Sequence, residues 1–312
     1  MGDSTTGFDR VRSMAAQQNG LVRAAQLREC GLEEAAIRHH LRRGNLTRAF
    51  GLHGVYLVPA LVSLRSSYLL RAHALQLSMG PGTVLAGRTA ALLWGIQGVP
   101  YREQDTLVVW RPTSHSRRDM SGVQVLRGTL DPEDVMSKDG VRVTSPERTL
   151  RDTVLCTDRD IAVSLMDSAI NLGLVRADRL PALEAANKGR MGQRRTAPWW
   201  RLADGRAQSP LETRIRLVCV DAGLPPDDLQ HPLLLPGGQN IFGDLWWDTG
   251  PVLVEADGAN SHAGPSGLFH DQHRQNALLA AYPGLKLLRF SWKDLSSPNT
   301  IVATIANALN PQ

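Results

Sequence analysis

The chain has 312 residues, of which 42% are hydrophobic and 21% are charged. This balance is typical of a globular protein with buried cores, and the length is enough for two or three domains. The sequence has no run of about 18 or more apolar residues and no apolar stretch behind a basic start. Neither a transmembrane helix nor a signal peptide is therefore expected.

Cysteine usage and charge distribution narrow the class of protein further. Cys30, Cys156 and Cys219 are far apart and form no CxxC pair, which favours a cytoplasmic location and disfavours a zinc site or a disulfide framework. The formal net charge is +5, and the positive charge is concentrated in residues 37–50 and 188–206. Acidic residues and a histidine gather near the C-terminus instead. This segregation indicates one part that binds a polyanion and a separate part that carries chemistry.

The N-terminal pattern indicates three short helices and a β-hairpin, over residues 8–19, 22–29, 33–43 and 46–59. Gly31 and Gly44 end the second and third helices. The third helix has acids in its first turn and bases in its last, an arrangement that matches the helix dipole. Two short helices joined by a glycine-containing turn, followed by a small hairpin, are typical of a winged helix-turn-helix.

In such a domain the second helix of the motif enters the major groove, so its exposed basic residues are the candidate DNA contacts. These residues are Arg38, His39, Arg42 and Arg43, with Arg48 of the hairpin beside them. A solvated basic helix on an ordinary three-helix domain is the alternative interpretation. The coincidence of turn, charge and hairpin favours DNA binding.

The middle of the chain has a mixed α/β pattern. Helices are expected over residues 67–79, 87–95, 159–173 and 177–187, and strands over residues 106–110, 123–127 and 140–143. Ser145, followed by proline, is a predicted helix cap. No catalytic constellation is visible, which indicates a structural role such as spacing, dimerisation or additional DNA contact. The basic segment 188–206 is interpreted as a linker.

The C-terminal pattern predicts an αβββαβα domain. Its expected elements are a helix over 209–222, strands over 230–235, 240–247 and 252–257, a helix over 265–281, a strand over 285–292 and a helix over 299–309. About four residues join the second and third strands, a length that suits a hairpin.

This hairpin places acidic residues together. If Trp247 lies opposite Val252, Asp244 lies opposite Glu255, and directly opposed residues have Cβ atoms roughly 4.5–5.5 Å apart. Alternation places Asp257 on the face of Glu255. Clustered carboxylates beside Phe242, Trp246 and Leu253 are costly unless a cation compensates them, and oxygen ligands suit Mg²⁺ or Mn²⁺.

Further candidate groups surround this cluster: Glu212 on the first helix, His262 in the loop after the third strand, and Asp271, Arg274 and Gln275 on the next helix. Acids for a metal, a histidine for proton transfer and an arginine for phosphate are the parts that metal-assisted phosphodiester hydrolysis needs. Each residue also has a structural alternative. Glu212 fits a capping box with Ser209, Asp244 fits an ion pair with an arginine, and Asp271 fits a helix N-terminus. His262 and Arg274 are compatible with ordinary surface positions.

The segments SPLETRIRLVCVDAGL, GDLWW, VLVEADGANSH and DQHRQNALLAAYPGLKLLRFSW, over about residues 207–296, resemble the Vsr-like branch of the PD-(D/E)XK nuclease superfamily. The resemblance implies a restriction-endonuclease-like fold with Asp244 and Glu255 as metal ligands and His262 in an assisting role. Asp257 occupies the position where the superfamily often has lysine. His262 or Arg274 would then take the part of the lysine.

The segments QNGLVRAAQLRECGL and GVYLVP, with the basic helix between them, resemble the N-terminal winged helix of AbiEi-type antitoxins, and VRVTSPERTLRDTV resembles the middle region found with it. The resemblance implies a DNA-binding transcriptional regulator of a toxin–antitoxin operon. A toxin partner and a homodimer are left open.

The sequence thus predicts a multidomain α/β protein: a winged helix-turn-helix over 1–60, a mixed α/β region over 61–187, a basic linker over 188–206 and a nuclease-type domain over 207–312. The first functional hypothesis is a DNA endonuclease that uses Mg²⁺ or Mn²⁺, with Asp257 and Glu212 tuning the site, in defence or repair. The alternative is an antitoxin-like regulator with an inactive nuclease fold. Both predict DNA as the partner and no membrane association.

Overall fold

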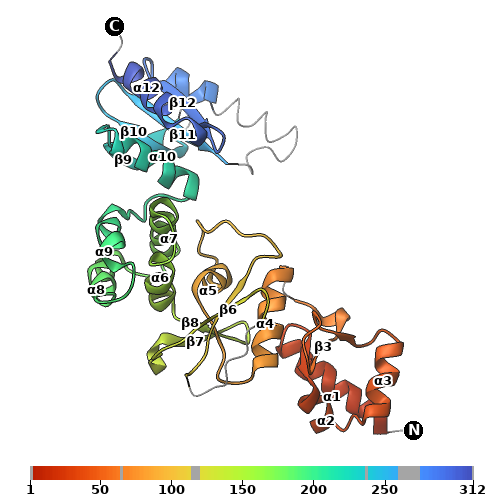
Figure 1. Cartoon of the computed structure of the whole chain (residues 1–312). Coiled ribbons are helices and arrows are strands. Elements are labelled where there is room, and N and C mark those ends of the chain that lie inside the picture. The colour runs from red at the N-terminus through yellow and green to blue at the C-terminus, as the bar shows by residue number, and fades with distance from the viewer. Residues whose placement is uncertain (1–2, 64–65, 114–119, 236–237, 259–274, 311–312) are drawn as a thin grey trace. The chain divides into compact units, whose positions relative to one another are not determined.

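The computed structural model describes residues 3–63, 66–113, 120–235, 238–258 and 275–310. The chain divides into two compact units, residues 1–153 and 154–312 (Figure 1). No helix among these residues is both long enough and apolar enough to cross a membrane.

The N-terminal domain consists of α1 (Asp3–Gln17), β1 (Leu21–Arg23), α2 (Ala24–Glu29), α3 (Glu34–Arg42), β2 (Thr47–Arg48) and β3 (Val55–Leu57), with η1 (Pro59–Leu61) after it. The strands form one sheet in the order β1-β3-β2. The predicted start of the second helix at residue 22 was wrong. Leu21 and Val22 are buried and pair with β3 instead. The helix begins after Arg23, whose backbone N–H donates to Gln26 at 2.8 Å.

The turn between α2 and α3 explains the glycine at position 31. The Gly31 N–H donates to the Arg28 carbonyl and the Leu32 N–H to the Leu27 carbonyl, which is the Schellman pattern that ends a helix. Gly31 has a φ of +87°, a conformation that side chains with a Cβ disfavour. Leu27 and Leu32 are both buried in the domain core, so the turn fixes the entry of the chain into α3.

The middle region is a five-stranded sheet with helices packed on it. Its elements are α4 (Ser67–Met79), β4 (Val84–Leu85), α5 (Gly87–Trp94), β5 (Leu107–Trp110), β6 (Val123–Leu126), η2 (Pro132–Asp134), β7 (Val135–Lys138), β8 (Val141–Thr144) and α6 (Pro146–Val154). The strand order is β6-β5-β4-β8-β7. Two strands of this sheet were not predicted. β4 has only two residues, and the partly polar sequence of β7 does not indicate a strand. The predicted cap is present, since Ser145 Oγ accepts from the Arg148 N–H at 3.3 Å.

The second unit begins with helices α7 (Arg159–Asn171), η3 (Ala177–Arg179), α8 (Leu180–Ala185), α9 (Gln193–Thr196) and η4 (Ala197–Leu202). The linker expected over residues 188–206 was therefore wrong, because the segment contains α9 and η4. Thr196 and Trp200 are buried, and η4 packs against α7. Its arginines lie mostly on the surface, so positive charge alone does not distinguish a linker from a short folded segment.

The C-terminal domain has the predicted element order. It contains α10 (Pro210–Asp221), β9 (Asp228–Leu234), β10 (Asn240–Trp247), β11 (Val252–Asp257), helical residues 275–281, β12 (Lys286–Ser291), η5 (Asp294–Ser296) and α12 (Pro298–Leu309). The sheet order is β12-β11-β10-β9, with β11 and β12 parallel and the other pairs antiparallel. The predicted pairing of Trp247 with Val252 is confirmed.

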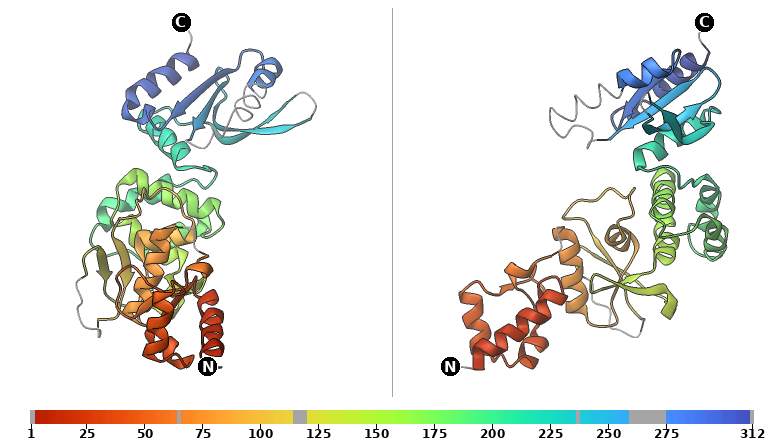
Figure 2. Two further views of the ribbon diagram at one scale, coloured as in Figure 1. Left: turned by 90° about the vertical axis from the view of Figure 1, so that its right-hand side faces the viewer. Right: turned by 180° about the vertical axis from the view of Figure 1, so that it is seen from behind.

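Helices cover both faces of this sheet (Figure 2). On one face α10 and α12 pack on the sheet in a core that includes Ile215, Leu245 and Ile305. On the other face Leu278 of the helical residues 275–281 packs in a second core with Trp246 and Leu253. The sheet is thus a central layer between two cores.

Candidate functional site

The N-terminal candidate surface is the basic side of α3. Ile37 is buried in the domain core and fixes which side of α3 faces solvent. The five predicted DNA contacts are all exposed: Arg38, His39, Arg42, Arg43 and Arg48. Arg38 also pairs with Glu34 at 3.4 Å, but such an exposed pair stabilises the helix by only about 0.3–0.5 kcal/mol. These residues are therefore accessible to a polyanion.

A groove of about 650 Å³ runs beside this helix, and its lining includes Arg12, His39 and Arg43. His40 of α3 has a different role from His39, because its ring stacks on Phe8 of α1 with centroids 3.9 Å apart. Burial, and next the charges of His39 and Arg43, lower the pKa of His40. His40 therefore packs α3 on α1 as a neutral ring, and the basic residues around it carry the positive charge.

The C-terminal candidate site begins at the first turn of α10. Ser209 Oγ accepts from the Glu212 N–H at 3.2 Å, and Glu212 Oε2 accepts from the Gln208 N–H at 2.9 Å. The predicted helix cap is thus present. Glu212 is also buried, and burial raises the pKa of its carboxyl group. Glu212 therefore caps the helix and also presents a partly desolvated carboxylate.

Gln230 joins Glu212 to Asp244. Its Nε2 donates to Glu212 Oε2 at 3.0 Å and to Asp244 Oδ1 at 3.1 Å. The backbone of Gln230 has a φ of +53°, which is uncommon for a residue other than glycine. Leu229 packs in the core under α10, whereas Leu233 packs in the core on the opposite face, although regular alternation would place both on one face. The reversal at Gln230 turns its amide toward the two carboxylates.

Asp244 lies at the centre of the cluster. Its Oδ2 accepts from the Ala256 N–H of β11 at 2.7 Å. Burial, then the charge of Glu212 and to a smaller extent that of Glu255, raise the pKa of Asp244 to about 6. Asp244 is therefore within electrostatic range of both Glu212 and Glu255, and its position beside Glu255 agrees with the predicted hairpin register. We name these three residues the acid cluster.

Asp257 is close to the acid cluster but is engaged by Arg289 of β12. Arg289 Nε lies 2.8 Å from Asp257 Oδ2 and its Nη2 lies 2.7 Å from Oδ1. The same Nε is 3.8 Å from Glu255 Oε2. Both Asp257 oxygens thus accept from the guanidinium, which disfavours Asp257 as a metal ligand.

The structure therefore divides the predicted C-terminal site residues into three groups. Glu212, Asp244 and Glu255 are brought together, and Asp257 is turned to an arginine. His262, Asp271 and Arg274 lie outside the described residues. Sequence analysis missed Gln230 and Arg289. Arg289 had a signal, a lone arginine between apolar residues of a predicted strand, whereas nothing in the sequence indicated the backbone conformation of Gln230.

The donor set of the acid cluster fits a small divalent cation bound partly through water. Within the described part of the chain, no three His, Cys, Asp or Glu side chains form a group that could hold a metal on their own. Mg²⁺, however, usually retains several waters and binds through one or two carboxylates together with substrate phosphates. Asp244 with one glutamate of the cluster meets that requirement, whereas a fully protein-ligated site would need more donors.

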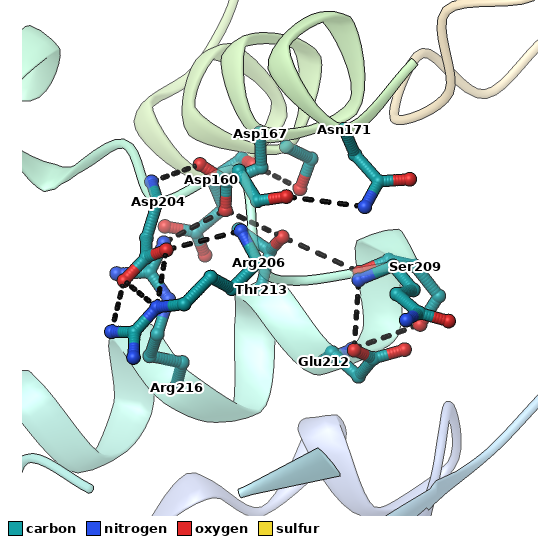
Figure 3. A network of polar contacts seen from close by, with 12 residues as sticks. Asp160, Asp167, Asn171, Asp204, Arg206, Ser209, Glu212, Thr213 and Arg216 are labelled. Atoms are coloured by element: carbon teal, nitrogen blue, oxygen red, sulfur yellow. Dashed lines mark hydrogen bonds and ion pairs between the residues drawn. The ribbon is translucent and has the colours of Figure 1, made fainter. Parts of the chain in front are cut away.

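A buried ion pair fixes α10 against α7 (Figure 3). Asp167 of α7 accepts from Arg216 Nη2 at 2.8 Å, from Thr213 Oγ1 at 2.8 Å and from the Asp204 N–H at 2.6 Å. The side chains of Asp167 and Arg216 are 1% and 9% exposed. Burial raises the pKa of Asp167 to about 6, and the positive charge of Arg216 opposes this rise. Because Thr213 follows Glu212 directly, this network also holds the first turn of α10 in place.

Comparison with known proteins identifies the N-terminal domain. Residues 9–59 match the family described as "Transcriptional regulator, AbiEi antitoxin". Two proteins of Mycobacterium tuberculosis are 28% identical to the chain over 240 residues. They are the uncharacterized proteins MT2308 (strain CDC 1551 / Oshkosh) and Rv2248 (strain ATCC 25618 / H37Rv). Each match covers 75% of this chain and 82% of the relative. The crystal structure of the RV2827C protein from the same species is similar with a TM-score of 0.40 and 18% identity, covering 74% of this chain and 89% of that chain.

The family match of residues 9–59 supports the prediction for the N-terminal domain. Residues 9–59 form an AbiEi antitoxin-like, DNA-binding helix-turn-helix domain. The nuclease resemblance of residues 207–296 stays a prediction, which the element order and the acid cluster support without establishing cleavage.

Proposed function

We propose that the protein binds DNA through α3 and hydrolyses phosphodiester bonds at the acid cluster with Mg²⁺ or Mn²⁺. The observation that carries this proposal is the Gln230 amide, which joins Glu212 to Asp244 beside Glu255. Burial of several carboxylates close together costs free energy, and a cation that binds between them recovers it. This proximity of Asp244 to two glutamates supports the proposal of a cation held partly through water.

The acid cluster would hold the cation through Asp244 and a glutamate. A bound cation would lower the pKa of a coordinated water and polarise the scissile phosphate. The protein groups around it are already oriented. The Ala256 and Gln208 N–H groups and the Gln230 amide fix the carboxylates of Asp244 and Glu212, so little reorganisation is needed when the substrate arrives. His262 for proton transfer and Arg274 for phosphate charge remain part of the proposal on sequence grounds.

Cleavage of supercoiled plasmid in Mg²⁺ tests the role of the glutamates. Glu212→Gln and Glu255→Gln are each expected to lower the rate by about 100-fold or more, since a lost ligand removes several kcal/mol of transition-state stabilisation. Asp221→Asn is the matched control, because Asp221 lies on α10 in an exposed ion pair with Arg159 and outside the cluster. Equal rates in Glu255→Gln and in the control would remove Glu255 from the site.

An antitoxin-like transcriptional regulator is the second candidate. The family match of residues 9–59 favours it. In that case the protein binds operator DNA, does not cut it in any divalent cation, and has a toxin as its partner. Retention of DNA binding without cleavage would select this function. A homodimer stays a prediction under both candidates.

Under both candidates α3 supplies the DNA contacts. The double variant Arg42→Ala with Arg43→Ala is expected to weaken binding and to flatten the slope of log affinity against log salt by about 1.8, because each phosphate contact contributes about 0.9. Fluorescence anisotropy over a salt series measures this slope. Arg102→Ala, an exposed arginine outside the helix-turn-helix, is the control. An unchanged slope in the double variant would rule out α3 as the DNA-contacting helix.

A further inference from the structure

We infer that Arg289 is a catalytic residue of this centre that binds the scissile phosphate, and that Asp257 is its positioning residue. The inference rests on the proposed function. It assigns to a described arginine the stabilisation of phosphate charge and gives Asp257 a role other than metal binding.

The first support is the register of the two parallel strands. Glu255 of β11 pairs with Arg289 of β12, and Asp257 pairs with Ser291. The guanidinium therefore arises beside Glu255 and reaches along the strand to Asp257. Its Nε is 2.8 Å from Asp257 and 3.8 Å from Glu255, so the positive charge lies against the edge of the acid cluster.

The second support is the partial exposure of this pair. The side chains of Arg289 and Asp257 are each 26% exposed, whereas that of Glu255 is 12% exposed. A charge pair that served only to close the core would be buried as Asp167 and Arg216 are. Arg289 instead keeps part of its side chain accessible to solvent beside Glu255.

The third support is electrostatic. DNA carries one negative charge per phosphate, and a group of carboxylates repels it. A guanidinium fixed beside the carboxylates offsets this repulsion and offers N–H donors in the planar arrangement that suits phosphate oxygens. Asp257 orients that plane by accepting from Nε and Nη2, as a carboxylate commonly orients a functional group that contacts substrate.

In the hydrolysis of the phosphodiester bond, Arg289 stabilises charge and takes part in no bond that forms or breaks. The oxygen of a water molecule forms a bond to phosphorus, the bond between phosphorus and the leaving oxygen breaks, and a proton lost by the water is balanced by one gained by the leaving oxygen. Arg289 transfers no proton, because a guanidinium group does not lose its proton in proteins. It stabilises the negative charge that accumulates on the non-bridging oxygens.

Two measurements on the full chain test the inference: plasmid cleavage in Mg²⁺ and affinity for Mn²⁺. Arg289→Ala is expected to lower the cleavage rate by about 100-fold or more, as removal of one charge-stabilising donor does. The same change is expected to leave Mn²⁺ binding intact or to tighten it, because a positive charge near the cation is removed. Added guanidinium ion at non-denaturing concentrations restores part of the activity. Asp257→Ala is expected to lower the rate about 10- to 100-fold.

The outcomes separate this inference from the proposed function. If wild type cuts DNA and Arg289→Ala cuts equally fast, the inference alone is rejected. Joint loss of cleavage and Mn²⁺ binding in Arg289→Ala would show a merely structural role and would also reject it. If wild type does not cut at all, both are rejected. Arg176→Ala is the matched control, because Arg176 forms an ion pair with Asp178 on the surface.

Discussion

Between pH 4 and pH 7 the Asp244→Asn variant is expected to gain about 2 kcal/mol of unfolding free energy relative to wild type, measured without divalent cations. Burial and the neighbouring glutamates raise the pKa of Asp244 from 3.8 to about 6. The folded state therefore binds the proton more tightly than the unfolded state, and wild type loses stability as pH rises through this window. A shift of about two pKa units corresponds to about 3 kcal/mol in total, and about 2 kcal/mol of it falls between pH 4 and pH 7 because the unfolded carboxyl is already half ionised at pH 4. The asparagine side chain does not titrate, so the variant does not lose this stability as the pH rises.

Urea unfolding of both proteins at several pH values measures this difference. Subtracting the two curves removes the contributions of titrating groups outside the acid cluster and the constant cost of replacing a carboxylate by an amide. Adding Mg²⁺ at pH 7 is expected to stabilise wild type and not the variant, because only a protein that binds the cation is stabilised by it. A difference that is the same at pH 4 and pH 7 would contradict the placement of Asp244 in a partly buried acid cluster.

Arg216→Ala is expected to lower the free energy of unfolding by about 3–5 kcal/mol, the usual result of leaving a buried charge without its partner. Asp167 is 1% exposed and would keep only the Thr213 hydroxyl and the Asp204 N–H among its present donors. The double variant Asp167→Leu with Arg216→Met removes both charges and is expected to recover most of the loss. Urea unfolding followed by tryptophan fluorescence measures both variants.

A loss below about 1 kcal/mol in Arg216→Ala would show that the pair is not buried as described. A double variant as unstable as the single one would show that packing, and not the unpaired charge, causes the loss. A stable but slower-cutting double variant would support the second role of the network, which is to hold Glu212 through Thr213.

The local parts of the C-terminal domain could be predicted from the sequence. Apolar alternation and a short connection indicate the register of β10 with β11, so the proximity of Asp244 and Glu255 follows from the residue pattern alone. The cap at Ser209 follows from a pattern of four residues. These features depend on neighbours in the sequence, and periodicity reports such neighbours directly.

The partners that lie far apart in the sequence could not be predicted. The contact between Asp257 and Arg289 depends on the parallel register of two strands joined by a long segment, and no turn fixes that register. Gln230 reaches both acids only because its backbone adopts a positive φ, which local propensity does not anticipate. The positive charge of residues 188–206 indicates a linker, whereas the burial of Thr196 and Trp200 depends on packing against α7, which charge does not report.

The most direct test of the central claim is cleavage of supercoiled plasmid by wild type and by Asp244→Asn, in Mg²⁺, in Mn²⁺ and in chelator. We predict cutting by wild type in either cation, none in chelator, and a rate at least about 1,000-fold lower in the variant, equivalent to about 4 kcal/mol of barrier. The variant keeps its salt-sensitive DNA binding, because α3 is unchanged. Cutting that survives in Asp244→Asn, or wild type that binds DNA and never cuts it, would contradict the proposed function.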